Sequence, residues 1–440
     1  MGRILGTWAM GSDGWPEVRL GDLVDERGIS YGVVQPGPAC SDGVPIIRVN
    51  NLQDGRIATD DIKRVSPDIE AKYGRTRLRG GELLMSLVGS LGQTAIVPPG
   101  LCGWNVARAV AVVPIRDNIG ADWVAYALRS PRLQHRMRTH ATTTVQATLN
   151  LQDVRELPIP LPEKAERERV TGVLRALDGR IELNRRVNHT LQSIVRAIFR
   201  SWFIDFDSVR KKMGGKAGGE FGLPTSLTAL VSGDVDSASD VPEGWSATTL
   251  GELVTVSRRT ATPSEIQGQT VNHYSIPAFD RGRMPAVEEG IGIKSNKFVV
   301  GDGMVLISRL NPRTPRVWIP RPRDRRAVCS TEFMVLTPRS GISVEFLYAL
   351  LDSEAFGREL ASRVTGTSGS HQRVQPADVL SIEVVLPTDA PVRQFTEAVR
   401  PALARATRLL EENERLAMLR DALLPELMAG RSRLAAGDRA

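Results

Sequence analysis

Apolar residues recur at a helical spacing in residues 162–206. One set of positions is separated by multiples of seven: Val170, Leu177, Leu191 and Ile198. Most of the other seam position is supplied by Val173, Val187 and Ile194. This heptad pattern is typical of coiled-coil helices. Asn184 fills the gap in the first set, either as a polar pair that fixes the register or as a residue at the solvent edge, and we favour the second interpretation.

A second apolar stripe runs through residues 387–432. It repeats the seven-residue interval at Leu409, Leu416 and Leu423, with Leu419 and Leu427 beside them. Each stripe needs an apolar partner, and we favour pairing of the two helices with each other. The first helix would be about 60 Å long at about 1.5 Å per residue, which is comparable with somewhat more than one turn of duplex DNA.

The remaining sequence is a long repeat. It opens with GWPEVRLGDLV at residue 14 and reopens with GWSATTLGELV at residue 244. In each copy a glycine turn leads into a buried apolar strand, followed by short helices that match at Tyr126 and Tyr348. Each copy ends with alternating apolar residues and a proline, in residues 153–162 and 378–387. A repeat of this length duplicates a domain.

These patterns divide the chain into five segments. Residues 1–161 and 244–386 are predicted to form two similar α+β domains, and residues 162–206 and 387–432 to form the two helices. Residues 207–243 are rich in Gly, Ser and Asp and lack sustained periodicity, which is typical of a flexible linker.

Composition and charge narrow the class of protein. The hydrophobic fraction of 41% and the charged fraction of 24% are typical of a folded soluble protein. The net charge of +7, carried mostly by arginine, favours an anionic partner such as nucleic acid, although an arginine-rich composition explains it equally well. The first residues lack a sustained apolar core, so we expect no signal peptide, no membrane span and a cytoplasmic location.

Catalytic motifs are missing from the sequence. It contains no GxxxxGK[ST] loop for nucleotide phosphates, no HExxH and no GxSxG. Cys40, Cys102 and Cys329 lie far apart, without a second cysteine or a histidine at metal-ligand spacing. The stretch NPRT at residue 311 lacks the second proline and the aromatic residue that hold a flipped base in amino-methyltransferases. We therefore predict a non-catalytic protein without cofactor or metal.

The sequence resembles the specificity subunits of type I restriction-modification systems over nearly its whole length. The resemblance is strongest in LNLQDVRELPIPLP at residue 149, in ALDGRIELNRRVNHTLQSIVRAIFRSWF at residue 176 and in the following IDFDSVR. The first domain is similar to the target-recognition domains of this family through GVPIIRVNNLQDGRI, GELLMSLVGSLGQTAIVP and NVARAVAVVPI. The second domain is similar through GDGMVLISR and PADVLSIEVVLP.

This resemblance implies a sequence-specific DNA-binding subunit. Its two target-recognition domains would be separated by an antiparallel coiled coil in a pseudo-two-fold arrangement, each binding half of a bipartite site in double-stranded DNA. The helices would dock two methyltransferase (modification) subunits, which methylate adenine with S-adenosylmethionine. In family complexes that cleave DNA, a motor-nuclease (restriction) subunit joins them.

Arginines dominate the candidate DNA contacts of the second domain. The stretch of residues 309–326 contains Arg309, Arg313 and Arg316, together with further arginines and Trp318. We expect phosphate contacts here, against the alternative of a hairpin whose arginines pair with acidic residues. A polar loop then adds His371, Gln372 and Arg373.

In the first domain, side chains that can read base edges lie at predicted strand ends or in a polar loop. The strand-end residues are Arg48, Asn50, Asn51, Asn105 and Arg108. The loop residues are Thr143, Thr144 and Gln146. Turn formation is the alternative role for the strand-end residues.

The first helix ends with the aromatic run FRSWF, which has no equivalent in the second helix. We predict that Phe199, Trp202 and Phe203 contact a partner subunit, and that the two docking surfaces are unequal. Two alternative functions stay open. One is an assembly scaffold that binds DNA only nonspecifically, and the other is a specificity component of a related methyltransferase or phage-defence system.

Overall fold

The chain folds into two compact units in a computed structural model. The structure describes residues 9–10, 15–38, 40–53, 55–143, 147–206, 244–322, 325–364 and 372–431. Unit 1 comprises Met1–Arg180 and Arg415–Ala440, and unit 2 comprises Ile181–Glu414. This division differs from the five predicted segments, because each long helix contributes one part to each unit. The predicted linker, residues 207–243, lies outside the described residues.

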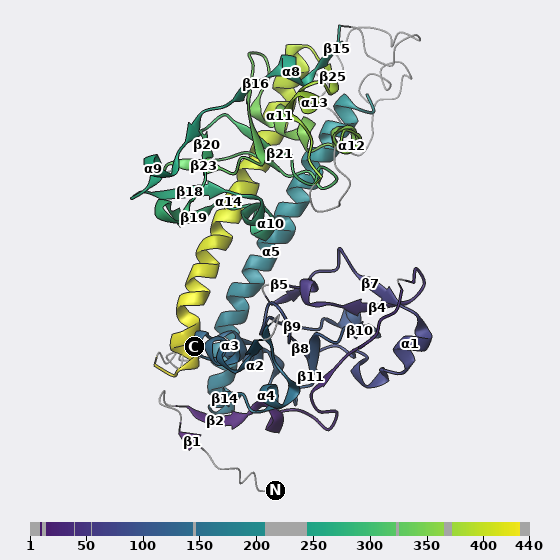
Figure 1. Ribbon diagram of the computed structural model, residues 1–440, viewed down its shortest axis with the longest axis vertical. Helices are drawn as coiled ribbons and strands as arrows, with labels where there is room; N and C mark the ends of the chain where they lie inside the picture. The colour runs from purple at the N-terminus through teal and green to yellow at the C-terminus, as the bar shows by residue number, and fades with distance from the viewer. Residues whose placement is uncertain are drawn as a thin grey trace, which may run out of the picture. The chain divides into compact units, whose positions relative to one another are not determined.

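Unit 1 mixes short strands with short helices (Figure 1). Its strands are β1 (Ala9–Met10), β2 (Pro16–Arg19), β3 (Ser30–Tyr31), β4 (Val44–Ile47), β5 (Leu52–Gln53), β6 (Arg56–Ile57), β7 (Lys63–Val65), β8 (Leu83–Ser86), β9 (Thr94–Ile96), β10 (Asn105–Val106), β11 (Val110–Val113), β12 (Thr142–Thr143), β13 (Ala147–Thr148) and β14 (Pro158–Pro160). Its helices are α1 (Pro67–Ala71), α2 (Ala121–Arg129), α3 (Pro131–His140) and α4 (Leu151–Arg155).

The central sheet of unit 1 has the strand order β3-β11-β8-β9. Strands β8 and β11 are buried along their whole length, as their mostly apolar sequences, LLMS and VAVV, favour. Because side chains alternate between faces, Leu83 and Met85 enter one core with Trp123 of α2, whereas Leu84 enters a second core with Val110. The sheet therefore separates two apolar layers.

Unit 2 repeats this plan with different strand lengths. Its strands are β15 (Ser246–Thr249), β16 (Val254–Ser257), β17 (Thr260–Ala261), β18 (Thr270–Tyr274), β19 (Ala286–Glu289), β20 (Lys297–Val300), β21 (Val305–Ser308), β22 (Val317–Trp318), β23 (Ala327–Cys329), β24 (Phe333–Pro338) and β25 (Glu383–Leu386). Its helices are α8 (Leu250–Leu253), α9 (Pro263–Ile266), α10 (Ile276–Gly282), α11 (Val344–Leu351), α12 (Glu354–Ser362) and α13 (Pro376–Leu380).

The two units share a sheet order and a strand-pairing pattern. The order β16-β24-β21-β22 in unit 2 corresponds to β3-β11-β8-β9 in unit 1. Each unit also contains one parallel strand pair, β4 with β10 and β18 with β23, in a second sheet. The sequence repeat is therefore a repeat of the fold.

Two helices of 40 residues each, α5 (Lys164–Phe203) and α14 (Asp389–Met428), contribute to both units. In unit 1, Leu174 of α5 shares a core with Leu427 of α14. In unit 2, Phe199 of α5 shares a core with Phe395 of α14. In unit 2, Asn184 of α5 bonds to Asn413 of α14, whereas the later Asn188 bonds to the earlier Ala406. The parts of the two helices in this unit therefore run in opposite directions.

The buried face of α5 differs from the predicted seam. Fully buried positions recur every seven residues at Leu174, Ile181, Asn188, Val195 and Trp202. Val187 and Ile194, which were assigned to the seam, are 36% and 39% exposed, and Val173 is only half-buried. The prediction was wrong for this set, because the buried face includes the polar Asn188, and a search for regularly spaced apolar residues does not find such a position.

Asn184 is also different from the favoured interpretation. Its side chain is 2% exposed, and its Nδ2 donates a hydrogen bond of 3.0 Å to Oδ1 of Asn413 on α14. One turn further along α5, Nδ2 of Asn188 donates to the backbone oxygen of Ala406 at 2.9 Å. Asn184 is therefore the buried member of a polar pair between the two helices, and not a residue at the solvent edge.

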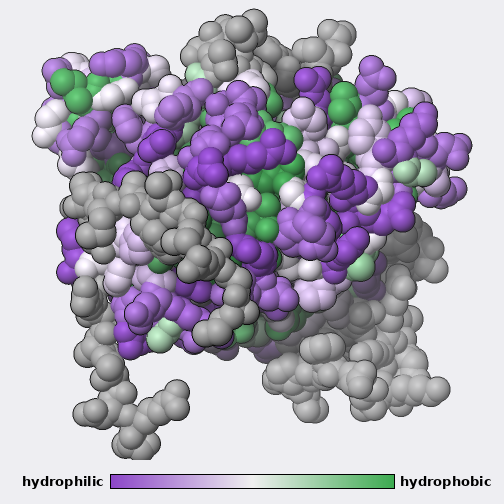
Figure 2. Space-filling view, turned by 90° about the horizontal axis from the view of Figure 1, so that it is seen from below, coloured by the Kyte–Doolittle hydropathy of each residue, from purple (hydrophilic) through white to green (hydrophobic). Residues whose placement is uncertain are grey.

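Hydrophilic side chains cover most of the face drawn in Figure 2 and surround a smaller group of apolar ones. Among the residues that the structure describes, no helix has the length and apolar character needed to cross a bilayer.

Candidate nucleic-acid interface

The arginine-rich stretch of unit 2 forms the connection between β21 and β22. Its backbone is held from several sides, since Arg309 donates its N–H to Glu332 and accepts from Val374, and Asn311 donates to Gln372. Asn311 has a φ of 51°, a left-handed conformation that Asn tolerates better than most residues. The connection is therefore a fixed loop that lies beside residues 372–374.

The arginines of this loop have different surroundings. Arg316 is only 9% exposed, and its Nε and Nη2 donate to the two carboxylate oxygens of Asp280 at 2.7 and 2.8 Å. Arg309 is half-buried and donates from Nη2 to the oxygen of Thr331 at 2.7 Å. Arg313 is exposed. Arg316 therefore has a structural role in this unit, whereas Arg313 presents its charge to solvent.

Arg373 and Gln372 lie next to this loop. Arg373 is exposed and donates to both carboxylate oxygens of Glu332, at 3.1 and 2.8 Å. Hydrogen bonding by Arg373 holds the pKa of Glu332 below its ordinary value. Gln372 is half-buried, and His371 lies outside the described residues. The charge of Arg373 is thus partly neutralised within the protein.

Three predicted contacts of unit 1 lie around Asp61, two at its carboxylate and one at its backbone. Nη2 of Arg48 donates to Oδ2 of Asp61 at 2.7 Å, and Nδ2 of Asn50 lies 3.4 Å from the same oxygen. Asn51 is buried, and its Nδ2 donates to the backbone oxygens of Ala58 and Asp61. Asn51 therefore has the turn-forming role that was its alternative, and its amide does not face solvent.

Asn105 is likewise a structural residue. Its side chain is fully buried and donates from Nδ2 to Glu70 and to the oxygen of Tyr73, while its Oδ1 accepts from Thr76. Arg77 is the main cause that lowers the pKa of Glu70, and Asn105 adds to the effect. A base edge cannot reach Asn105 without unfolding this cluster, which corrects the prediction for this residue. Arg108, by contrast, is exposed.

The polar loop of unit 1 is described only in part. Thr143 lies in β12, and its side chain is not among those that the structure describes. Thr144 and Gln146 lie outside the described residues. The predictions for these three residues stay predictions.

The aromatic run at the end of α5 is part of the core of unit 2. Phe199, Trp202 and Phe203 are 1%, 8% and 4% exposed. Phe203 packs against Phe346 of α11 and Phe395 of α14, with ring centroids 5.1 and 5.3 Å apart. These side chains are therefore unavailable to a partner subunit, and the prediction of a docking role is corrected, because burial inside the unit already satisfies their apolar surface.

A polar network that the sequence did not reveal links α2 to both long helices in unit 1. Asp178 of α5 accepts from Tyr126 at 2.9 Å, from Arg129 at 3.2 Å and from Arg420 of α14 at 2.8 Å. Burial alone would raise the pKa of Asp178, but Arg129 and Arg420 hold it below its ordinary value. Burial also raises the pKa of Tyr126. The match of Tyr126 with Tyr348 in the repeat was the available signal in the sequence for this network. The sequence around Asp178 does not indicate which residues its carboxylate contacts.

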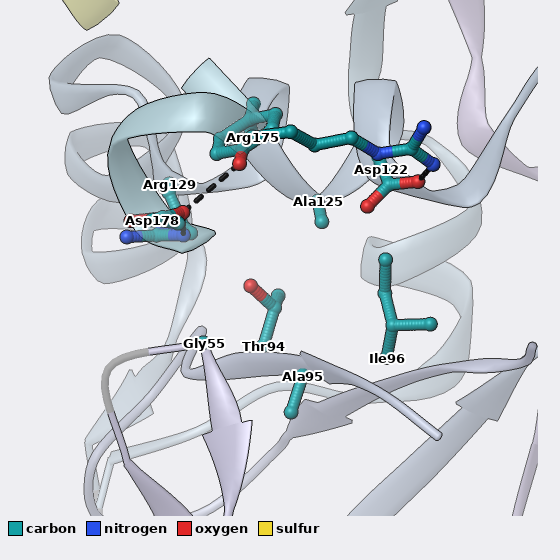
Figure 3. A pocket seen from close by; sticks show the side chains of 10 residues that line it. Gly55, Thr94, Ala95, Ile96, Asp122, Ala125, Arg129, Arg175 and Asp178 are labelled. Atoms are coloured by element: carbon teal, nitrogen blue, oxygen red, sulfur yellow. Dashed lines mark hydrogen bonds and ion pairs between the residues drawn. The ribbon is translucent and has the colours of Figure 1, made fainter. Parts of the chain in front are cut away.

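Beside this network lies a cavity of about 200 Å³ (Figure 3). Its lining includes Thr94 of β9, and an ion pair between Arg175 and Asp122 at another wall. Among the described residues, no group of three or more His, Cys, Asp or Glu side chains is placed to hold a metal ion.

Residues 12–193 match the family model of the type I restriction modification DNA specificity domain. This match confirms the resemblance of that stretch to type I specificity subunits.

Two curated relatives are specificity subunits by name. The type I restriction enzyme EcoBI specificity subunit of Escherichia coli is 33% identical over 196 residues, which cover 42% of this chain and 41% of the relative. The HindI specificity subunit of Haemophilus influenzae is 23% identical over 331 residues, covering 64% of this chain and 70% of the relative. The matched region thus spans less than half of the first relative.

The fold has a counterpart among solved structures. The S subunit of a type I restriction-modification system from M. genitalium superposes with a TM-score of 0.50 at 15% identity, covering 95% of this chain and 97% of that chain. At this identity the likeness concerns the fold alone.

Proposed function

We propose that this chain is the sequence-specific DNA-binding subunit of a type I restriction-modification complex and is not itself an enzyme. The match to the DNA specificity domain and the names of the relatives support this proposal. The observation that carries it is the repetition of one sheet order in two units, because two similar domains suit a target of two parts.

In this proposal, target-recognition domains at residues 1–161 and 244–386 each bind one half of a bipartite site. Residues 162–206 and 387–432 separate them as an antiparallel coiled coil with a pseudo-two-fold arrangement, and residues 207–243 join the halves. The opposite directions of α5 and α14 within unit 2 support this arrangement. Paired helices resist bending, which a target with a fixed spacer requires.

Exposed arginines are the best-supported DNA contacts. Arg313 in unit 2 and Arg108 in unit 1 are exposed, and Arg309 lies in the same fixed loop as Arg313. Arginine binds phosphate oxygens and guanine edges with the same planar group. We assign these residues first to phosphate contacts, which supply most of the affinity for DNA. The candidates for base contacts stay Thr143, Thr144, Gln146, His371 and Gln372.

The outer face of α5 is the surface that we assign to modification subunits. Leu183, Val187 and Ile194 are 51%, 36% and 39% exposed, and their spacing of four and seven residues puts them on one side of the helix. Thr190 and Ala197 are exposed on the same side and carry no charge. An uncharged stripe of this length is suited to a helix of another protein. It replaces the buried aromatic run as the proposed docking surface.

Co-expression with candidate modification subunits tests the function. The purified complex is given plasmid DNA and S-adenosylmethionine, and methylated adenines are then located by single-molecule sequencing. We expect methylation at one bipartite sequence. Methylation of no preferred sequence, with equal affinity for every duplex, contradicts the proposal and favours an assembly scaffold.

A further inference from the structure

Helix α3 of unit 1 has a solvent face that is entirely basic or uncharged. Leu133 and Met137 are buried. Every polar side chain of the helix is exposed except that of Gln134. The exposed set is Arg132, His135, Arg136, Arg138, Thr139 and His140. The helix contains three arginines and no acidic residue. Since 3.6 residues make a turn, these side chains cover more than half of the helix circumference.

The helix is fixed to the loop that follows β8. Nε2 of Gln134 donates to the oxygen of Gly92 at 3.0 Å and to the oxygen of Leu128 at 2.9 Å. Met137 packs on Gly92, where an added Cβ would lie 2.6 Å from its Cε. The arginines therefore project from a surface that is held in place.

Most of the positive charge of α3 is not neutralised within the unit. Arg132 pairs with Glu17. In the part of the chain that the structure describes, Arg136 and Arg138 form no ion pair, and both are exposed. Two free guanidinium groups, with a histidine on either side of them in the sequence, form the basic surface that needs explanation.

The equivalent helix of unit 2 has kept the core positions and lost the charge. Phe356 and Leu360 of α12 are buried at the spacing of Leu133 and Met137. The exposed charged residues of α12 are Glu354, Arg358 and Glu359. Packing therefore does not require arginines on this helix, because the copy with two glutamates folds against the same kind of sheet.

The loops that follow β8 and β21 show the reverse distribution of charge. The loop after β8, residues 87–92, has the uncharged sequence LVGSLG, whereas the loop after β21 contains Arg309 and Arg313. Each loop pairs with the segment that follows its helix, through the bridges Val88 to Thr148 and Leu310 to Arg373. Both units thus have cations near the end of the equivalent strand, on the helix that packs on the loop after β8 in unit 1 and on the loop after β21 in unit 2.

We propose that α3 is the surface by which the first domain binds the sugar-phosphate backbone of duplex DNA, in the place that the loop of Arg309 and Arg313 takes in the second domain. This inference rests on the proposed function. A helix of this length extends about 15 Å. With one phosphate per about 3.4 Å of duplex axis on each strand, it spans several phosphates. Phosphate contacts carry no sequence information, so α3 supplies affinity and orientation but not target choice.

Salt-dependent binding by the complex with its modification subunits tests this inference. The double variant Arg136→Gln, Arg138→Gln is compared with wild type on two duplexes, one with and one without the methylated target. We expect weaker binding to both duplexes by the same factor, and a slope of log affinity against log salt that is smaller by about two units. The methylated sequence should be unchanged.

The matched control is Arg358→Gln on α12, which removes an exposed arginine from the equivalent helix. It should leave the affinity and the slope of the wild type. An unchanged slope in the double variant overturns the inference, as does a loss confined to the target duplex or an equal loss in the control. If the wild-type complex methylates no preferred sequence but the slope still falls on changing α3, the inference stands and the proposed function fails.

Discussion

Asn184 and Asn413 pair across the two long helices, with Nδ2 of one 3.0 Å from Oδ1 of the other. The pair is continued by Asn188 and Gln192, which are both buried on the same face of α5. Buried amides are costly without partners but favour the one alignment that satisfies them. The helices in unit 2 therefore have a defined register, and apolar packing alone would permit several.

Replacing one member of this pair should cost more than replacing both. Asn184→Leu leaves the half-buried amide oxygen of Asn413 without its donor, so we expect a loss of about 1 kcal/mol in the free energy of unfolding. The double variant with Asn413→Leu should recover most of this loss, because two apolar groups replace two polar ones. Denaturant unfolding of the four proteins measures the coupling, and additive losses would contradict a direct pair.

Asp178 should make the stability of unit 1 depend on acidic pH. Its pKa is lower in the folded protein than in the unfolded chain, so its contribution is present above its ordinary pKa near 3.8 and is lost as pH falls through the folded value. We expect Asp178→Asn to lower the thermal midpoint at neutral pH and to flatten its decline below about pH 4. Asp302→Asn, an exposed site, is the control, and parallel curves for wild type and Asp178→Asn would contradict the network.

Phe199 should matter for folding and not for assembly. Phe199→Ala leaves a cavity among Phe203, Phe346 and Phe395, which we expect to cost about 3–5 kcal/mol. Differential scanning calorimetry of the isolated chain measures the loss without any partner. A variant that is as stable as the wild type would restore the docking role that the sequence predicted.

Ile194 should show the opposite behaviour. Ile194→Glu changes an exposed residue on the outer face of α5, so the free energy of unfolding should stay within about 0.5 kcal/mol of the wild type. We expect the variant to lose co-purification with the modification subunits, because a charge would be buried against an apolar partner. The control is Arg405→Glu, which changes an exposed residue of α14 and should keep the complex. Thr407→Glu is less suitable because Thr407 is partly buried. Retained assembly in Ile194→Glu would remove this surface from the proposal.

Arg313 and Arg316 should separate DNA affinity from stability. Arg316→Ala leaves Asp280 without its bidentate partner and should lower the unfolding midpoint. Arg313→Ala should leave stability unchanged and reduce the salt slope of DNA binding by about one unit. Binding titrations at several salt concentrations, together with unfolding curves, distinguish the two. A stable Arg313→Ala with an unchanged slope would exclude a phosphate contact by this residue.

The amino-acid sequence by itself determined the elements and their repetition. The runs LLMS at residue 83 and VLIS at residue 305 became equivalent buried strands, because their three consecutive apolar side chains need a cover on both faces of the sheet. The seven-residue spacing placed two long helices within residues 162–206 and 387–432, and the quoted motifs identified the specificity domain. Local sequence patterns were therefore sufficient to predict the features whose physical cause is local, such as strands and helices.

Only the tertiary structure decided which polar and aromatic groups face inward. Asn188 lies in the seam because Ala406, far along the chain, supplies its acceptor, and Arg316 is buried because Asp280 neutralises it. Phe203 is in a core because Phe346 and Phe395 surround it, although its run resembles an exposed docking site in the sequence. The burial of such a side chain depends on a partner from a distant segment, and the spacing of residues along the chain does not contain that partner.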